Sequence, residues 1–121
     1  MSNEVTKNII SAAIEVHRHL GPGLLESIYE SALCHEFDIR KLSYEKQKQI
    51  EVIYKGMPIK GQRIDIVVEN EIIVELKATH HFNEVFISQT LSYLKASGLS
   101  TALIINFAKS RLIEGIKRVS L

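Results

Sequence analysis

The chain has 121 residues, of which 45% are hydrophobic and 24% are charged, and its 15 Lys and Arg against 14 Asp and Glu give a formal net charge of +1. This composition excludes a disordered segment and a strongly basic nucleic-acid-binding tail, so any grip on nucleic acid has to come from a local patch of basic side chains. We expect a single domain over residues 1–121, large enough for one hydrophobic core.

The sequence carries no pattern of a membrane or secreted protein. No stretch approaches the roughly 18 apolar residues of a membrane-spanning helix, and the first residues are polar rather than an apolar signal core. The single cysteine, Cys34, has no partner for an internal disulfide and lies in an apolar helical pattern, as is typical in a reducing compartment. We expect a cytoplasmic protein without membrane contact, in which Cys34 is a buried structural thiol.

Two helices are predicted at the start of the chain. Apolar residues recur at helical spacing from Val5 to Leu20, and the Gly-Pro-Gly segment at 21–23 ends that pattern. A second helix is predicted from about Leu25, because its apolar residues again fall three and four positions apart as far as Phe37.

The apolar pattern then becomes that of strands, with one more helix among them. Strands are predicted over residues 47–54, 61–69, 71–78, 101–107 and 111–119. A third helix is predicted over about 83–96, with Gly98 as its C-terminal stop. A helix between the third and fourth strands permits a parallel pair. We therefore expect an α/β fold in which helices flank a mixed central β-sheet.

Charged residues interrupt the two strands around Asn70. If the hairpin folds symmetrically about Asn70, residues whose numbers add to 140 face each other, which places Asp65 opposite Glu75 and Arg63 opposite Lys77. The Cβ atoms of the two carboxylates would lie roughly 4.5–5.5 Å apart. The alternate aliphatic residues are expected on the other face, in the core. They are Ile64, Ile66, Val68, Ile72, Val74 and Leu76.

Two explanations fit these charges. Neighbouring carboxylates repel each other, so they need a cation between them or a raised pKa on one of them. Oxygen ligands favour Mg²⁺ or Mn²⁺, beside which Lys77 would hold or deprotonate an attacking water. The same residues also fit an exposed sheet face with ion pairs from Arg63 to Glu75 and from Asp65 to Lys77. The residues alone leave both explanations open.

The spacing of Asp65 and Glu75-Leu76-Lys77 resembles the D…ExK core of the PD-(D/E)XK nuclease superfamily. The order of helix, three-stranded meander, helix and strand also resembles that restriction-endonuclease-like fold, and the likeness covers about residues 9–119. Ile64 departs from the pattern, since the name of the superfamily places Pro there.

Two further segments strengthen the resemblance. Residues Gly23 to Tyr29 fit the GxxExxY signature of a family of small bacterial and archaeal proteins that is usually placed in this superfamily. Residues Gln89 to Tyr93 resemble the QxxxY element of its exonuclease-like branches.

The resemblance implies a role for each matching residue. Asp65 and Glu75 would ligate the metal, with the main-chain carbonyl of Leu76 as a third ligand, and Lys77 would orient the nucleophilic water. Glu26 resembles the helix carboxylate that approaches the same metal directly or through water. Without the resemblance, Glu26 is explained as a carboxylate favoured by the dipole at a helix start.

Three residues are candidates for substrate binding. Gln89 and Tyr93 are four positions apart, on one helix face, where they would close the site and touch the substrate backbone. Gln89 is also compatible with an ordinary surface amide. Arg63 either binds phosphate or balances the acidic pair. Histidines 80 and 81 are not expected to bind a metal together, because adjacent residues of a strand point in opposite directions. We expect them in a loop or on the surface.

The resemblance thus implies a metal-dependent nuclease that hydrolyses phosphodiester bonds in nucleic acid, with DNA favoured over RNA and Mg²⁺ or Mn²⁺ as the cofactor. The alternative is a non-catalytic nucleic-acid-binding or assembly module that retains the nuclease fold, since a fold does not establish a function. Nucleic acid is the expected partner, and the sequence leaves a homodimer or a larger complex open.

Overall fold

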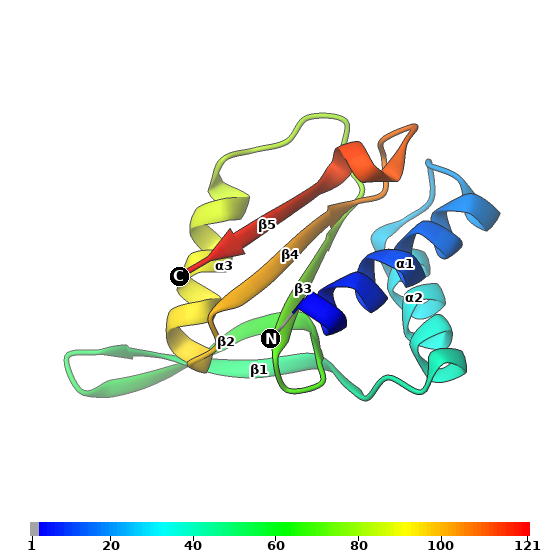
Figure 1. Cartoon of the computed structure of the whole chain (residues 1–121). Coiled ribbons are helices and arrows are strands. Elements are labelled where there is room, and N and C mark those ends of the chain that lie inside the picture. Colours follow the sequence, from blue (N-terminus) through cyan, green and yellow to red (C-terminus); the bar gives the residue numbers. More distant parts are fainter. Residues whose placement is uncertain (1–2) are drawn as a thin grey trace.

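The computed structural model describes residues 3–121 (Figure 1). Its elements are, in chain order, α1 (Asn3–Leu20), α2 (Glu26–Arg40), β1 (Tyr44–Tyr54), β2 (Met57–Val68), β3 (Ile72–Lys77), α3 (Val85–Ser97), β4 (Thr101–Asn106), the short 3₁₀ helix η1 (Leu112–Gly115) and β5 (Ile116–Ser120). No helix in this part of the chain is long and apolar enough to cross a membrane.

The five strands form one sheet in the order β1-β2-β3-β4-β5. Neighbouring strands are antiparallel except for β3 and β4, which run parallel because α3 carries the chain back between them. The predicted α/β fold with a mixed sheet is confirmed. Helices α1 and α2 lie on one side of the sheet and α3 lies on the other (Figure 1).

Each face of the sheet has its own apolar core. Beneath α1 and α2 are Ile9, Ala12, Ala13, Val16, Tyr29, Leu33, Cys34, Phe37, Ile66, Val68, Ile72, Val74, Leu76, Leu103, Ile105, Phe107 and Leu112. Beneath α3 are Ile50, Ile64, Val67, Ile73, Tyr93, Leu94, Ala102, Ile104 and Val119. Cys34 is buried and free, as predicted, and burial raises the pKa of its thiol to about 11.

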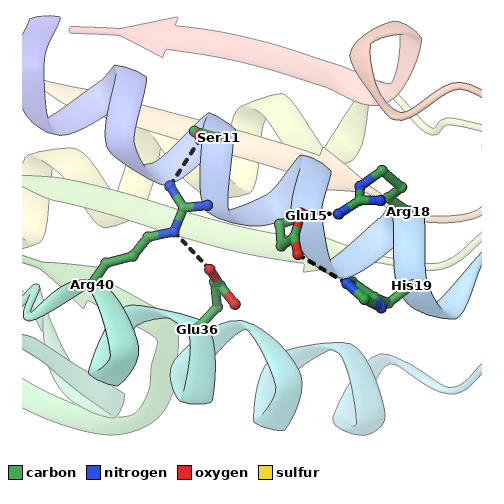
Figure 2. A network of polar contacts seen from close by, with 6 residues as sticks. All are labelled: Ser11, Glu15, Arg18, His19, Glu36 and Arg40. Atoms are coloured by element: carbon green, nitrogen blue, oxygen red, sulfur yellow. Dashed lines mark hydrogen bonds and ion pairs between the residues drawn. The ribbon is translucent and has the colours of Figure 1, made fainter.

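Polar contacts link α1 to α2 at the surface (Figure 2). Arg40 of α2 donates from Nε to Glu36 Oε2 at 2.8 Å and from Nη1 to Ser11 Oγ of α1 at 2.9 Å. A second group lies within α1, where Glu15 contacts Arg18 and His19 at 2.8 and 2.9 Å. Apolar packing holds the two helices together, and the Arg40 contacts at the surface add little free energy to it.

The hairpin register follows the prediction. Ile66, Val67 and Val68 pair with Val74, Ile73 and Ile72, respectively, so the paired numbers add to 140. The turn uses left-handed backbone at Glu69 and Asn70, with φ of 55° and 51°.

The prediction for Ile64 was wrong in one respect. Ile64 is buried, but it packs beneath α3, whereas Ile66 packs beneath α1 and α2. The alternation breaks between them, where Gln47 on the partner strand has a left-handed φ of 51° and no ladder partner. A local irregularity of this kind turns the following side chains to the opposite face. The face expected to carry only charges is therefore largely a second core.

Helices α1 and α3 each end at a glycine, as the sequence predicted. Gly21 has φ of 69° and donates its N–H to the His17 carbonyl at 2.8 Å, and Gly98 has φ of 78° and donates to the Leu94 carbonyl at 3.0 Å. The last predicted strand begins differently, because η1 occupies its first part. Gly115 in η1 lies against the Asn106 carbonyl, where a Cβ atom would clash.

Candidate active site

Asp65 and Glu75 are joined across β2 and β3 by crossed hydrogen bonds. The regular pairing of these strands ends at Ile66 and Val74. At the next position the Asp65 N–H donates to Glu75 Oε2 at 2.9 Å, and the Leu76 N–H donates to Asp65 Oδ2 at 2.8 Å. Each carboxylate therefore replaces a backbone carbonyl as the acceptor for the opposite strand, and this fixes the predicted juxtaposition of Asp65 and Glu75.

Burial and mutual repulsion disfavour two negative charges here. Glu75 is only 3% exposed, and its burial, with the nearby charge of Asp65, raises its pKa to about 8. Burial also raises the pKa of Asp65, although the Leu76 N–H, Lys77 and Gln47 oppose the shift. Two ionised carboxylates at this site would therefore carry more negative charge than their surroundings compensate.

Lys77, the last residue of β3, is the basic group beside the pair. Its charge lowers the pKa of both carboxylates, although less than burial raises them. Its Nζ lies 4.3 Å from the ring centroid of Phe86 on α3, a favourable position for a cation over an aromatic face. Its carbonyl accepts a hydrogen bond from the Phe107 N–H at 2.8 Å. Its side chain thus contacts α3 and its backbone contacts the residue that follows β4, while its charge is close enough to the acidic pair to influence both carboxylates.

Helix α3 presents Tyr93 and Gln89 on one face. Tyr93 is 4% exposed, and burial together with the charges of Glu75 and Asp65 raises its pKa to about 12. Its hydroxyl therefore stays protonated near the carboxylates. Gln89, one turn earlier, is half-buried, and its side-chain amide makes no hydrogen bond to any described residue.

Glu26 is the first residue of α2 and is exposed. Its charge is the smallest of the named influences that raise the pKa of Glu75, so it acts on the site from its edge. Across residues 3–121 no three His, Cys, Asp or Glu side chains gather closely enough to hold a metal ion. The set of ligands implied by the resemblance is therefore not assembled around Glu26.

The hydroxyl of Tyr29 holds the loop that precedes α2. Its hydroxyl donates to the Gly21 carbonyl at 2.5 Å and accepts from the Leu24 N–H at 3.1 Å. These bonds fix the loop from which Glu26 starts the helix. The same loop, with Ala78, His80 and Ala108, lines a hollow of about 310 Å³.

Arg63 lies outside this arrangement. It is exposed and pairs through its backbone with Gln49 of β1. The prediction that it faces Lys77 was wrong, because the β2–β3 ladder ends before Arg63 and Lys77 is turned toward α3. Neither of the expected cross-strand ion pairs is present among the residues described. Glu75 is buried, so an exposed sheet face does not account for the acidic pair.

Gln47 is a site residue that sequence reasoning missed. Its side chain lies close enough to Asp65 to lower the pKa of that carboxyl, and its Nε2 donates to the carboxylate of Glu30 at 3.1 and 3.2 Å. It thereby connects α2 to the acidic pair. The surrounding Lys-Gln-Lys-Gln segment is typical of a solvated strand, so no signal in the sequence marked it.

A family model described as the PD-(D/E)XK nuclease superfamily matches residues 3–119. The chain belongs to the PD-(D/E)XK nuclease superfamily. No curated protein and no solved structure matches it significantly.

PD-(D/E)XK nucleases generally use divalent metal ions, and the donor set at the crossed pair fits such an ion. The carboxylates of Asp65 and Glu75 and the carbonyl of Leu76 are hard oxygen donors, which Mg²⁺ and Mn²⁺ prefer. The raised pKa of Glu75 indicates a position where an added positive charge would be favourable.

Proposed function

We propose that the protein is a metal-dependent nuclease that hydrolyses phosphodiester bonds in nucleic acid, with DNA favoured over RNA and Mg²⁺ or Mn²⁺ as the cofactor. The observation that carries the proposal is the crossed pair of the partly buried Asp65 and the buried Glu75 beside Lys77. A structural role alone gives no reason to bury one carboxylate beside a second, partly buried one without a cation paired to either.

In this proposal Asp65, Glu75 and the Leu76 carbonyl hold the metal ion. When bound, the ion would lower the pKa of water and neutralise charge on the scissile phosphate. Lys77 supplies a fixed positive charge at the same edge, because Phe86 orients its ammonium group. It would hold the attacking water or stabilise the negative charge that develops on phosphorus.

The residues around the metal position would complete the substrate site. Gln89 offers an unbonded amide, and Tyr93 a hydroxyl that stays protonated, so both would donate to backbone oxygens of the substrate. Glu26 would reach the metal through water, since it is exposed at the start of α2.

Calorimetric titration with Mn²⁺ tests the metal site before any substrate is chosen. We expect wild type to bind Mn²⁺, Asp65→Ala to lose binding, and Glu4→Gln, which changes an exposed carboxylate of α1, to bind as wild type. Cleavage of single-stranded, duplex and branched DNA and of RNA in Mn²⁺ then tests the reaction. If Glu75→Gln leaves both metal binding and cleavage unchanged, the site assignment is wrong.

One observation favours a second candidate function, a nucleic-acid-binding module without turnover. The carboxylate of Glu26 does not join Asp65 and Glu75 in a cluster of three ligands within the described structure. Nucleic-acid binding without cleavage in saturating Mn²⁺ would support this second candidate and overturn the first.

A further inference from the structure

The hairpin of β1 and β2 continues beyond the body of the protein. Its outer part, residues 48–63, is called the arm here, and Figure 1 shows it projecting past α3. Every residue from 51 to 63 is exposed. An isolated two-stranded hairpin is at best marginally stable in water, so an extension of this length is expected to have a partner.

The charge of the arm differs from that of the remaining chain. The arm holds four basic residues, Lys48, Lys55, Lys60 and Arg63, and one acidic residue, Glu51. The remainder has 11 basic and 13 acidic residues. A formal charge of +3 on the arm therefore stands beside −2 on the rest, although the whole chain is nearly neutral. A partner of negative charge is indicated.

The basic groups of the arm are mostly available. Lys60 and Arg63 make no ion pair with any described residue. Lys55 Nζ lies 5.5 Å from the ring centroid of Tyr54, and Lys48 makes a long ion pair with Glu45 at 3.5 Å. Binding an anionic partner would therefore break at most one weak ion pair.

The arm also exposes apolar side chains. At least 44% of the surface of each is accessible, and they are Val52, Ile53, Tyr54, Met57 and Ile59. Apolar contact alone would fit a second copy of the chain, but two arms packed together would oppose their positive charges. Nucleic acid offers apolar sugar and base edges beside phosphates, and apolar side chains of binding proteins contact these edges.

We propose that the arm grips duplex DNA beside the nuclease site, an inference that rests on the proposed function. One strand of the arm and Asp65 both belong to β2, so this strand sets the distance between them. Pro58 near the tip lies seven positions before Asp65, which is about 23 Å of extended strand. At about 3.4 Å per base pair, the arm would contact the duplex about 7 base pairs from the scissile phosphate. A two-stranded ribbon fits the major groove.

Fluorescence anisotropy tests the arm without metal or cleavage. It measures the binding of a fluorescein-labelled duplex of about 24 base pairs in EDTA, over a series of salt concentrations. The test variant is Lys55→Gln with Lys60→Gln. The matched control is Lys7→Gln with Lys41→Gln, which removes two exposed lysines outside the arm, one on α1 and one at the C-cap of α2. We expect the arm variant to lower the slope of log K against log salt by about 1.8, at about 0.9 per lost phosphate contact, and the control to leave it unchanged.

Equal slopes in the two variants, or no binding by wild type in EDTA, would overturn the proposal for the arm. Metal-dependent cleavage would still be tested separately by Asp65→Ala, so the two proposals fail independently. Sedimentation adds a further outcome. A concentration-dependent dimer that Ile53→Asp dissociates, with an unchanged salt slope in the arm variant, would assign the arm to self-association and overturn DNA binding.

Discussion

The rings of Tyr29 and Phe107 stack with centroids 4.4 Å apart and planes within 9° of parallel. Tyr29 also holds the loop before Glu26 through its hydroxyl, and the N–H of Phe107 bonds to the carbonyl of Lys77. The stack therefore connects the start of α2 to the end of β3. The stack is thus one of the contacts in the shared apolar core that join two edges of the candidate site far apart in sequence.

Tyr29→Phe separates the stack from the loop contacts. The variant keeps the ring on Phe107 but loses the bonds to the Gly21 carbonyl and the Leu24 N–H. We expect the free energy of unfolding to fall by about 1–2 kcal/mol, with faster proteolysis in the loop at 21–25. Tyr29→Leu, which also loses the stack, should cost more. Urea unfolding measures both variants, and equal stability of Tyr29→Phe and wild type would contradict the role of the hydroxyl.

Glu75 should make stability depend on pH. Its folded pKa near 8 lies above the ordinary value of 4.5, so the folded state holds this proton more tightly than the unfolded chain does. The contribution of Glu75 to the free energy of unfolding should therefore be fully present below about pH 4.5 and be lost as pH rises from about 4.5 to about 8.

Glu75→Gln should remove most of this fall. The amide oxygen still accepts from the Asp65 N–H, but the buried charge is gone. In EDTA at pH 8 we expect the variant to be more stable than wild type, on the order of a few kcal/mol. Thermal unfolding at a series of pH values measures this, with Glu4→Gln as the control. Parallel curves for wild type and Glu75→Gln would show that Glu75 is not the source.

The pairing of Asp65 with Glu75 could be predicted because a symmetric hairpin leaves one register, and the apolar alternation excludes a slip by one residue. The register therefore followed from the sequence through Ile66. It failed at Ile64 and Arg63, because the left-handed backbone of Gln47 depends on the adjacent strand and on α2. Periodicity within one strand contains no information about such a neighbour.

For the site residues near the helices, too, some positions could be predicted from the sequence and others could not. The face shared by Gln89 and Tyr93 followed from their spacing on α3. The contact of Lys77 with Phe86 could not be predicted, because it depends on how α3 crosses the sheet. The position of Glu26 was expected from the motif, but its distance from the pair depends on the loop that Tyr29 fixes.

Asn106 should be important for the segment that follows Lys77. It is 1% exposed. Its Nδ2 donates to the Thr79 carbonyl at 2.9 Å, while its Oδ1 accepts from the N–H groups of Thr79 and Ala108 at 3.2 and 3.1 Å. Asn106→Ala leaves these backbone groups unpaired, and we expect a loss of about 2–4 kcal/mol in urea unfolding.

Asn83→Ala provides the comparison for Asn106→Ala. Asn83 is exposed and its Oδ1 accepts one hydrogen bond, from the Val85 N–H at 2.9 Å. Its loss should cost about 1 kcal/mol, since water can replace the side chain. Similar losses for the two variants would contradict a special role for the buried amide.

Lys77→Met tests whether the ammonium group takes part in cleavage. The methionine keeps an apolar contact with Phe86 but removes the charge. We expect cleavage under single-turnover conditions in Mn²⁺ to fall by about 10²–10³-fold, the usual loss when one stabilising group of a transition state is removed. Affinity for Mn²⁺ should stay the same or rise, because a competing positive charge has gone. Lys7→Met on α1 is the control. If Lys77→Met cleaves as wild type while Asp65→Ala is inactive, the metal site acts without Lys77, and its position over Phe86 has another purpose.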